Sequence, residues 1–289
     1  MNLGEQRKTI QQVAIYTNLS RPKADEARLR LCEWLAKRNI AIKELDEVFQ
    51  ESDIADADLI ISLGGDGTIL RLVSKMIRPA IPVLGVNLGS LGFITEVREE
   101  ELYDELKSIL LGQYEVEERM LLSATVRFGE GVENRGLERR LQALNDIVVN
   151  REGLTRYMHV QVEVGGETAI AFYGDGVIIA TPTGSTAYSL SAGGSIVHPS
   201  LDNMMITPIC AHTSASRSLV VSGNQVVKIR IRCDSDKEKA LLSADGQVDL
   251  AIDHETVVEI TKAENRFLLV KSSKRSYFGT LREKFNFPG

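Results

Sequence analysis

The short motif Gly64–Thr68 places one carboxylate, that of Asp66, among three glycines. It follows the continuous apolar run Asp58–Leu63 and precedes apolar residues at helical spacing, so we expect a buried strand, a tight turn and a helix. Glycines let backbone approach a ligand closely, and the free N–H groups of a helix N-terminus bind phosphate. The motif predicts a phosphate site with Asp66 beside it and Thr68 as the helix cap. An ordinary tight turn without chemistry is the alternative.

A second segment, Thr181–Gly194, consists mostly of small and hydroxylated residues. Its hydroxyls and amides could donate to and accept from the ribose, phosphate and base of a nucleotide. A flexible linker is the alternative interpretation. It is disfavoured because a buried-type strand, Gly176–Ala180, leads into the segment and because Tyr188 is poorly suited to a linker.

Two shorter motifs are weaker. Asn145-Asp146 opens the apolar run that ends at Asn150, and a carboxylate there could accept two hydrogen bonds from a ribose diol. Asp245-Gly246-Gln247 has the composition of a β-turn in which Gln247 could reach a ligand. Taken alone, each is more typical of a turn than of a site.

Several familiar sites are absent from the sequence. It contains neither the P-loop pattern, nor GxGxxG, nor GxSxG. The four histidines are scattered and the three cysteines form no CxxC, so no protein metal site and no disulfide framework are predicted.

Composition narrows the class of protein. The chain has 289 residues, 43% of them hydrophobic, which suits about two folded domains. Lys and Arg number 34 against 40 Asp and Glu, a net charge of −6, which argues against nucleic acid or a membrane as partner. With no apolar signal segment and no run of 18 apolar residues, we expect a cytoplasmic protein.

The predicted elements change in kind near residue 115. Residues 1–115 alternate strands and helices, which predicts an α/β domain with a parallel sheet. Residues 116–270 are rich in short β-branched runs, which predicts a β-rich, antiparallel, sandwich-like domain. The tail 271–289 has a helical pattern and is expected to pack back on the first domain.

The motifs together resemble those of bacterial NAD kinases. These are GGDGT (64–68), GVNLGSLGF (85–93), Asn145-Asp146, the segment 175–194 and Asp245–Gln247, in the family's order and spacing over about residues 10 to 280. GGDGT alone also occurs in lipid kinases, whereas the long serine- and glycine-rich segment is specific.

The resemblance implies an ATP-dependent kinase that phosphorylates the 2′-hydroxyl of the adenosine ribose of NAD to give NADP, with Mg²⁺ or another divalent metal accompanying ATP. It also implies an active site in the cleft between the two domains, and a homodimer or homotetramer in which a neighbouring subunit can complete the NAD site. The alternatives are a lipid or sugar kinase sharing GGDGT and a non-catalytic NAD(P)-binding regulator.

Carried over residue by residue, the resemblance makes Asp66 the catalytic residue that meets the 2′-hydroxyl, with Gly67 in the same loop. The NAD-binding residues it implies are Asp66, Gly67, Asn145, Asp146, Arg156, Asp175, Thr186, Ala187, Tyr188, Ser189, Leu190, Ser191 and Gln247. Arg71 could reach phosphate, since it lies about one turn into the predicted helix, and Phe93 could pack against adenine. Tyr173 stands where many relatives have arginine, which leaves acceptance of NADH open.

Overall fold

The computed structural model describes residues 8–18, 22–76, 81–129, 137–153, 158–212, 217–232 and 239–287. The chain divides into two compact units, one formed by residues 1–118 with 267–289 and the other by 119–266. The sequence prediction had placed the divisions at residues 115 and 270. Residues 116–118 and 267–270 therefore belong to the first unit, whereas the sequence pattern assigns them to the second domain.

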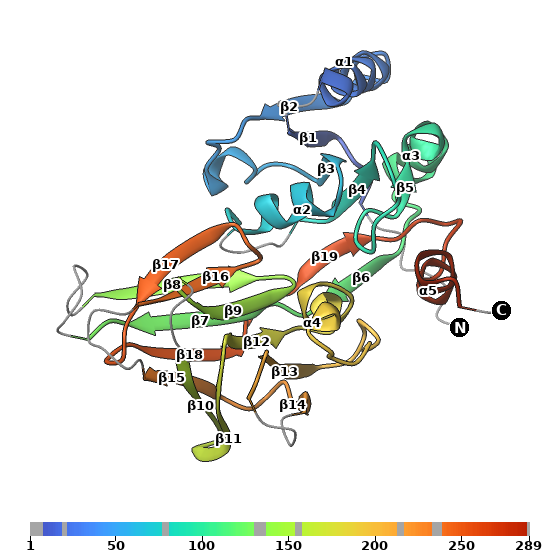
Figure 1. Cartoon of the computed structure of the whole chain (residues 1–289). Coiled ribbons are helices and arrows are strands. Elements are labelled where there is room, and N and C mark those ends of the chain that lie inside the picture. The colour runs from blue at the N-terminus through green and yellow to red at the C-terminus, as the bar shows by residue number, and fades with distance from the viewer. Residues whose placement is uncertain are drawn as a thin grey trace. The chain divides into compact units, whose positions relative to one another are not determined.

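The first unit is built on a largely parallel sheet (Figure 1). Its strand order is β2 (Ala41–Leu45), β1 (Gln12–Thr17), β3 (Leu59–Gly64), β4 (Val83–Asn87), β19 (Phe267–Val270) and β6 (Val116–Arg119), with the short β5 (Val97–Arg98) also paired to β4. The pairs that β1 forms with β2 and β3, and that β4 forms with β3, β5 and β19, are parallel. The carboxyl ends of β3 and β4 are therefore neighbours at one edge of the sheet, where ligands bind in parallel α/β layers.

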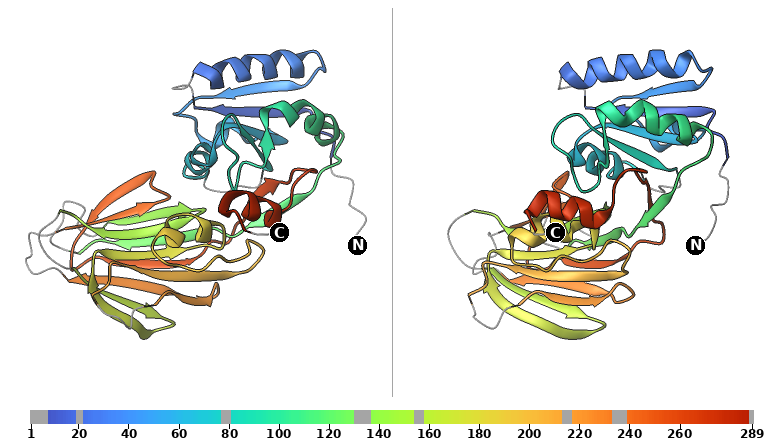
Figure 2. Two further views of the ribbon diagram at one scale, coloured as in Figure 1. Left: turned by 45° about the vertical axis from the view of Figure 1, so that its right-hand side comes forward. Right: turned by 90° about the vertical axis from the view of Figure 1, so that its right-hand side faces the viewer.

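Helices lie on both faces of this sheet (Figure 2). Helices α1 (Pro22–Ala36) and α3 (Leu102–Leu110) share one apolar cluster with β1, β3 and β4, to which α1 contributes Leu31 and Leu35. Helix α2 (Asp66–Val73) packs on the opposite face, where a Cβ on Gly85 would lie 2.6 Å from the Ile69 Cδ1. The remaining helical elements are η1 (Glu51–Asp53), η2 (Glu99–Glu101) and α5 (Tyr277–Phe285).

The second unit is antiparallel and consists of two sheets. One has the order β11 (Glu167–Gly174), β10 (Met158–Val164), β15 (Val227–Arg232), β18 (Val257–Lys262), β7 (Leu122–Arg127) and β8 (Glu138–Ala143). The other has the order β14 (Leu219–Ser222), β13 (Asn203–Ile209), β12 (Gly176–Ala180), β9 (Asp146–Arg151), β16 (Ala240–Ala244) and β17 (Val248–Ile252). The helical turns η3 (Thr183–Thr186) and α4 (Tyr188–Ser191) follow β12.

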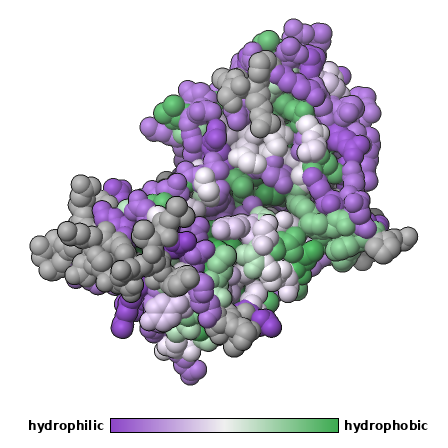
Figure 3. Space-filling view, viewed as in Figure 1, coloured by the Kyte–Doolittle hydropathy of each residue, from purple (hydrophilic) through white to green (hydrophobic). Residues whose placement is uncertain are grey.

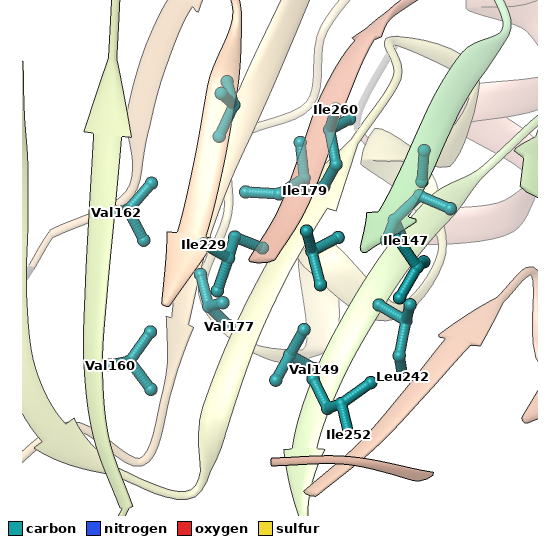
Figure 4. Close-up of a cluster of buried hydrophobic side chains, with 14 of the residues drawn as sticks. Ile147, Val149, Val160, Val162, Val177, Ile179, Ile229, Leu242, Ile252 and Ile260 are labelled. Atoms are coloured by element: carbon teal, nitrogen blue, oxygen red, sulfur yellow. The ribbon is translucent and has the colours of Figure 1, made fainter. Parts of the chain in front are cut away.

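The core of the second unit is formed by apolar side chains that alternate along each strand and point toward the facing sheet. Val177 and Ile179 of β12 point toward the facing sheet, where Ile229 and Ile260 belong to the same buried cluster (Figure 4). Ile178, between them, joins a second cluster on the outer face of its sheet, together with Val197. This double burial explains why β12 is continuously apolar rather than alternating.

Both fold predictions are confirmed: a parallel α/β unit and an antiparallel β-rich unit with two packed sheets. Hydrophilic residues cover the α1 end of the first unit in the face shown in Figure 3. Within the described residues, no helix is long and apolar enough to cross a membrane.

Candidate functional site

The turn after β3 differs in one detail from the prediction. Strand β3 ends at Gly64, Gly65 takes the N-cap position in extended conformation, and Asp66 is already the first residue of α2. Thr68 is therefore not the cap. It lies buried in the first turn, against Gly64, where an added Cβ would clash with the Thr68 hydroxyl. Gly64 is required for this close packing of helix on strand.

The Asp66 carboxylate is held by four hydrogen bonds from one loop. Its Oδ2 accepts from the Phe93 N–H at 2.8 Å. Its Oδ1 accepts from the Ile94 N–H at 3.2 Å, the Thr95 N–H at 2.9 Å and the Thr95 hydroxyl at 2.8 Å. Hydrogen bonds to an ionised carboxylate are stronger than those between neutral groups, so this arrangement fixes the orientation of Asp66.

A relay from β4 sets the direction of the Thr95 hydroxyl. The Asn87 amide Nδ2 donates to the Thr95 Oγ1 at 2.8 Å, and the Asn87 Oδ1 accepts from the Gly89 N–H at 2.7 Å. Because the Thr95 hydroxyl has a single proton, accepting from Asn87 leaves that proton for Asp66. Asn87 thereby helps position the carboxylate from the end of the neighbouring strand.

A cavity of about 410 Å³ in the first unit opens beside Asp66. It is lined by the glycine turn, by the loop after β4 and by two lysines: Asn18, Lys23, Ala24, Leu63, Gly64, Gly65, Asp66, Thr68, Asn87, Leu88, Gly89, Ser90, Leu91, Gly92 and Lys284. With exposed backbone, the start of α2 and lysine side chains in its wall, the cavity has the character of a phosphate site.

In the second unit, Asp245 organises the entry to β9. Asp245 and Gly246 both have positive φ, 51° and 62°, so they form the type I′ turn between β16 and β17. The buried Asp245 carboxylate accepts from the N–H groups of Leu144 and Asn145 at 2.7 Å and of Asp146 at 2.9 Å. A turn about 100 residues later in the chain thus fixes the backbone of the Asn-Asp pair.

A second cavity, of about 390 Å³, lies over this pair. Its lining residues are Asn145, Asp146, Val148, Asn150, Ala187, Tyr188, Ser243, Asp245 and Gly246. The Asn145 Oδ1 is buried and accepts no hydrogen bond from the described residues. An unsatisfied buried oxygen on a polar cavity wall is suited to a ligand donor such as a hydroxyl or an amide.

The two carboxyl groups of this cavity titrate near neutrality. Burial, and secondarily the charge of Asp245, raise the pKa of Asp146 to about 7. Burial also raises the pKa of Asp245 to about 6, although its three backbone hydrogen bonds oppose the rise. Because those N–H groups need an acceptor, Asp245 is the carboxyl group that ionises first, and Asp146 is the one that stays protonated to higher pH.

This titration predicts a pH-dependent stability difference between the wild type and Asp146→Asn. Folded Asp146 keeps its proton up to about pH 7, whereas the ordinary value is 3.8. The stability supplied by the neutral form is full below that ordinary value and is lost as pH rises through the folded pKa. The variant, neutral throughout, should gain up to about 4 kcal/mol over the wild type between pH 4 and 8.

Urea unfolding at a series of pH values measures this difference, with Asp249→Asn, an exposed change in β17, as the matched control. A difference between wild type and Asp146→Asn that stays constant across the pH range would contradict the assignment.

Only part of the predicted segment 186–191 faces the second cavity. Ala187 and Tyr188 line it. The Thr186 hydroxyl lies 3.3 Å from the Thr183 carbonyl oxygen, and the buried Ser189 hydroxyl pairs with that of Thr207 at 3.0 Å. Leu190 is half-buried and Ser191 exposed, and neither lines the cavity.

Three other predicted residues of the second unit lie outside that lining. The Asp175 carboxylate pairs with the Arg151 Nε at 2.7 Å. Tyr173 is exposed on β11 and contacts His159 edge to face, with 4.9 Å between ring centroids. The Gln247 Nε2 donates to the Asp245 carbonyl oxygen at 3.2 Å, beside the cavity.

The remaining predictions fall in the first unit or outside the described residues. Arg71 pairs with Glu47 at 3.2 Å and does not line the cavity of Asp66. Phe93 supplies a backbone donor to Asp66, and its ring stacks on Phe285. Gly67 is exposed at the start of α2, and Arg156 lies outside the described residues.

Sequence reasoning missed residues that act through backbone contacts. Thr95 and Gly92 hold and accommodate Asp66, and Asp245 holds the Asn-Asp pair. The sequence showed the motifs GVNLGSLGF and Asp245–Gln247, but it did not show the hydrogen bonds that they make with Asp66 and with the Asn145-Asp146 backbone. Lys23 and Lys284, which lie in the wall of the first cavity, carried no sequence signal.

Comparison with family models covers most of the chain. Residues 30–114 match the ATP-NAD kinase N-terminal domain and residues 144–272 match the ATP-NAD kinase C-terminal domain. An NAD kinase of Geotalea daltonii is 40% identical over 286 residues, spanning 95% of this chain and 98% of the relative. An NAD kinase of Magnetococcus marinus is 37% identical, with 95% and 93% covered.

Two solved structures of NAD and NADH kinases have a similar fold. An NAD kinase from Archaeoglobus fulgidus in complex with ATP superposes with a TM-score of 0.76 at 27% identity, covering 96% of this chain and 99% of that one. Yeast NADH kinase complexed with NADH has the same fold, with a TM-score of 0.87 at 23% identity over 98% of this chain and 89% of that one. On the strength of both domain matches and the full-length relatives, the chain belongs to the ATP-NAD kinase family.

Proposed function

We propose that the chain transfers the γ-phosphoryl group of MgATP to the 2′-hydroxyl of the adenosine ribose of NAD, producing NADP and ADP. The observation that carries the proposal is the Asp66 carboxylate, oriented by four hydrogen bonds on the wall of a glycine-lined cavity. The proposed substrates follow from family membership, and the geometry of Asp66 provides a carboxylate that can orient a hydroxyl group and accept its proton.

Asp66 is the proposed acceptor for the proton of the 2′-hydroxyl. Its Oδ2 accepts only one hydrogen bond from the described residues and so has room for a second donor. In phosphoryl transfer the 2′-oxygen forms a bond to the γ-phosphorus while the bond to the β–γ bridging oxygen breaks. The proton passes late to the carboxylate, whose main work is to orient the hydroxyl in line.

The donor phosphates are proposed to lie in the cavity beside Asp66. Backbone of the glycine turn and the first turn of α2 face that space. Mg²⁺ would be held chiefly by the ATP phosphates, where it would neutralise the charge that develops on the transferred group. No group of three potential metal-ligating side chains occurs among the described residues.

NAD is proposed to bind over Asn145 and Asp146. The unsatisfied Asn145 Oδ1 and the Asp146 carboxyl group suit ribose hydroxyls, and the Tyr188 ring offers an apolar surface. The other residues carried over from the family, Arg156 and Thr186–Ser191 among them, remain proposals for the same ligand.

The position of Asp175 is relevant to the oligomeric state of the protein. It is paired with Arg151, and because successive side chains of β9 alternate, Arg151 leaves the strand opposite to Asn150, which lines the cavity. We infer that Asp175 reaches NAD bound to a second copy, which supports a homodimer or homotetramer. A reducing, cytoplasmic location is the proposal consistent with the unpaired thiols of Cys32 and Cys210.

The direct test is to incubate the purified protein with NAD, ATP and Mg²⁺ and to assay the product with an NADP-specific dehydrogenase. We expect NADP to accumulate only when ATP is present. Absence of NADP from a correctly folded preparation would overturn the proposal.

A further inference from the structure

The C-terminal helix α5 brings a lysine to the cavity that contains Asp66. Lys284 belongs to its last turn and lines that cavity together with Asp66 and Gly92, although it is more than 190 residues away from both in sequence. The family motifs end well before this helix, so the proposed function gives Lys284 no role.

Several contacts hold α5 in the first unit. The Ser276 hydroxyl caps the helix by accepting from the Gly279 N–H at 3.2 Å, and Leu281 is buried. Glu283 pairs with Arg98 at 3.0 Å, which ties the helix to the end of β5. Lys284 is thus presented by an anchored element rather than by a loose tail.

The residue after Lys284 contacts the loop that orients the catalytic carboxylate. The Phe285 ring stacks on the Phe93 ring, with 5.6 Å between centroids and 29° between planes. The N–H of the same Phe93 donates to Asp66. Leu281 and Phe285 are four residues apart and share the face of α5 that packs on this unit, and the exposed Lys284 lies at the border of that face, three residues after Leu281.

The two lysines of the cavity differ in their surroundings. The Lys23 ammonium lies 3.0 Å from the Leu88 carbonyl oxygen and 3.6 Å from Glu99. For the exposed Lys284 ammonium, no hydrogen bond or ion pair is formed with any residue that the structure describes. Lys284 is therefore the lysine of this cavity whose ammonium group forms no hydrogen bond or ion pair with an oxygen of the described residues.

We propose that the Lys284 ammonium group binds the phosphates of the donor nucleotide. The anchored helix α5 places this group at the Asp66 cavity. This deepens the proposed function by assigning a phosphate-binding side chain at the donor site. An ammonium group on a flexible stem suits phosphate oxygens as a point charge, and Lys23, the other lysine of the cavity, already contacts protein oxygens.

The test compares Lys284→Met with Lys284→Arg and with Arg282→Met, an exposed change on the same helix that does not line the cavity. We expect Lys284→Met to raise the KM for ATP about tenfold, with the KM for NAD unchanged within about twofold. Lys284→Arg should restore most of the ATP affinity, and Arg282→Met should match the wild type.

Calorimetric titration with ATP and with AMP, in the absence of NAD, separates a phosphate contact from a packing role. We expect Lys284→Met to weaken binding of ATP about tenfold and binding of AMP much less. Unchanged ATP affinity, or equal losses for ATP and AMP, would overturn the proposal for Lys284. Because the titration does not require turnover, it decides this point even if the wild type makes no NADP, a result that would count against the proposed function instead.

Discussion

Asp66→Asn should lower kcat for NADP formation by about 10³-fold, the scale of a lost acid–base group. The substituted amide keeps the shape of the side chain and one acceptor oxygen. That oxygen can still accept from Ile94 and Thr95, but the amide nitrogen then faces the Phe93 N–H, a donor against a donor. The variant also lacks the group that accepts the 2′-hydroxyl proton.

The affinity of Asp66→Asn for NAD shows whether the substitution removes only the reacting carboxylate or also disrupts the NAD site. The pocket proposed for NAD is built from Asn145, Asp146 and Tyr188, which belong to the other unit of the chain. We therefore expect the Kd for NAD, measured by calorimetry, to stay within a few-fold in Asp66→Asn. Asp104→Asn, an exposed carboxylate paired with Lys107, is the control and should keep wild-type turnover. Turnover in Asp66→Asn equal to that of the wild type would remove Asp66 from its role.

Gly92→Ala is expected to lower kcat by about 10²-fold, although the change adds a single methyl group. A Cβ on Gly92 would lie inside the contact distance of the Asp66 Oδ1, Cγ and Oδ2 atoms. Either the carboxylate turns away or the loop moves and loses its N–H donors. Displacement of a reacting group by about 1 Å can cost that much.

A methyl group elsewhere in the same loop is the matched control. Among the described residues, apart from those adjacent in sequence, the one atom within 4 Å of a Cβ on Gly89 would be the Asn87 Oδ1, at 3.8 Å. We expect Gly89→Ala, assayed at saturating ATP and NAD, to keep kcat within a few-fold. If both alanine variants turned over equally well, the close approach of Gly92 to Asp66 would have no bearing on activity.

Periodicity in the sequence was enough to predict the fold class. Of the run 58–63, residues Leu59 to Leu63 are buried in β3, and alternation in residues such as Ile229 and Ile231 predicted the half-buried strand β15. The cap was wrong because extended Gly65 occupies the N-cap position, so the helix begins two residues before Thr68. Glycine is also common at caps, and local propensity does not choose between the two.

The architecture of the site depends on contacts that sequence spacing does not encode. Asp66 and Phe93 are 27 residues apart, and Asp245 and Asn145 are 100 residues apart. Which carboxylate receives which N–H depends on how the strands pair, here β9 with β16. Motifs therefore located the candidate residues, whereas the donors that orient them emerged only from the structure.

We propose that the phosphoryl group is transferred to the 2′-hydroxyl of the adenosine ribose and to no other hydroxyl of NAD. Phosphorus NMR of the product made from NAD and ATP tests it most directly. We expect one new monophosphate resonance, coupled to the 2′ proton of the adenosine ribose, with ADP formed in equal amount. A phosphate at another hydroxyl, or ADP formed without phosphorylated NAD, would contradict the account.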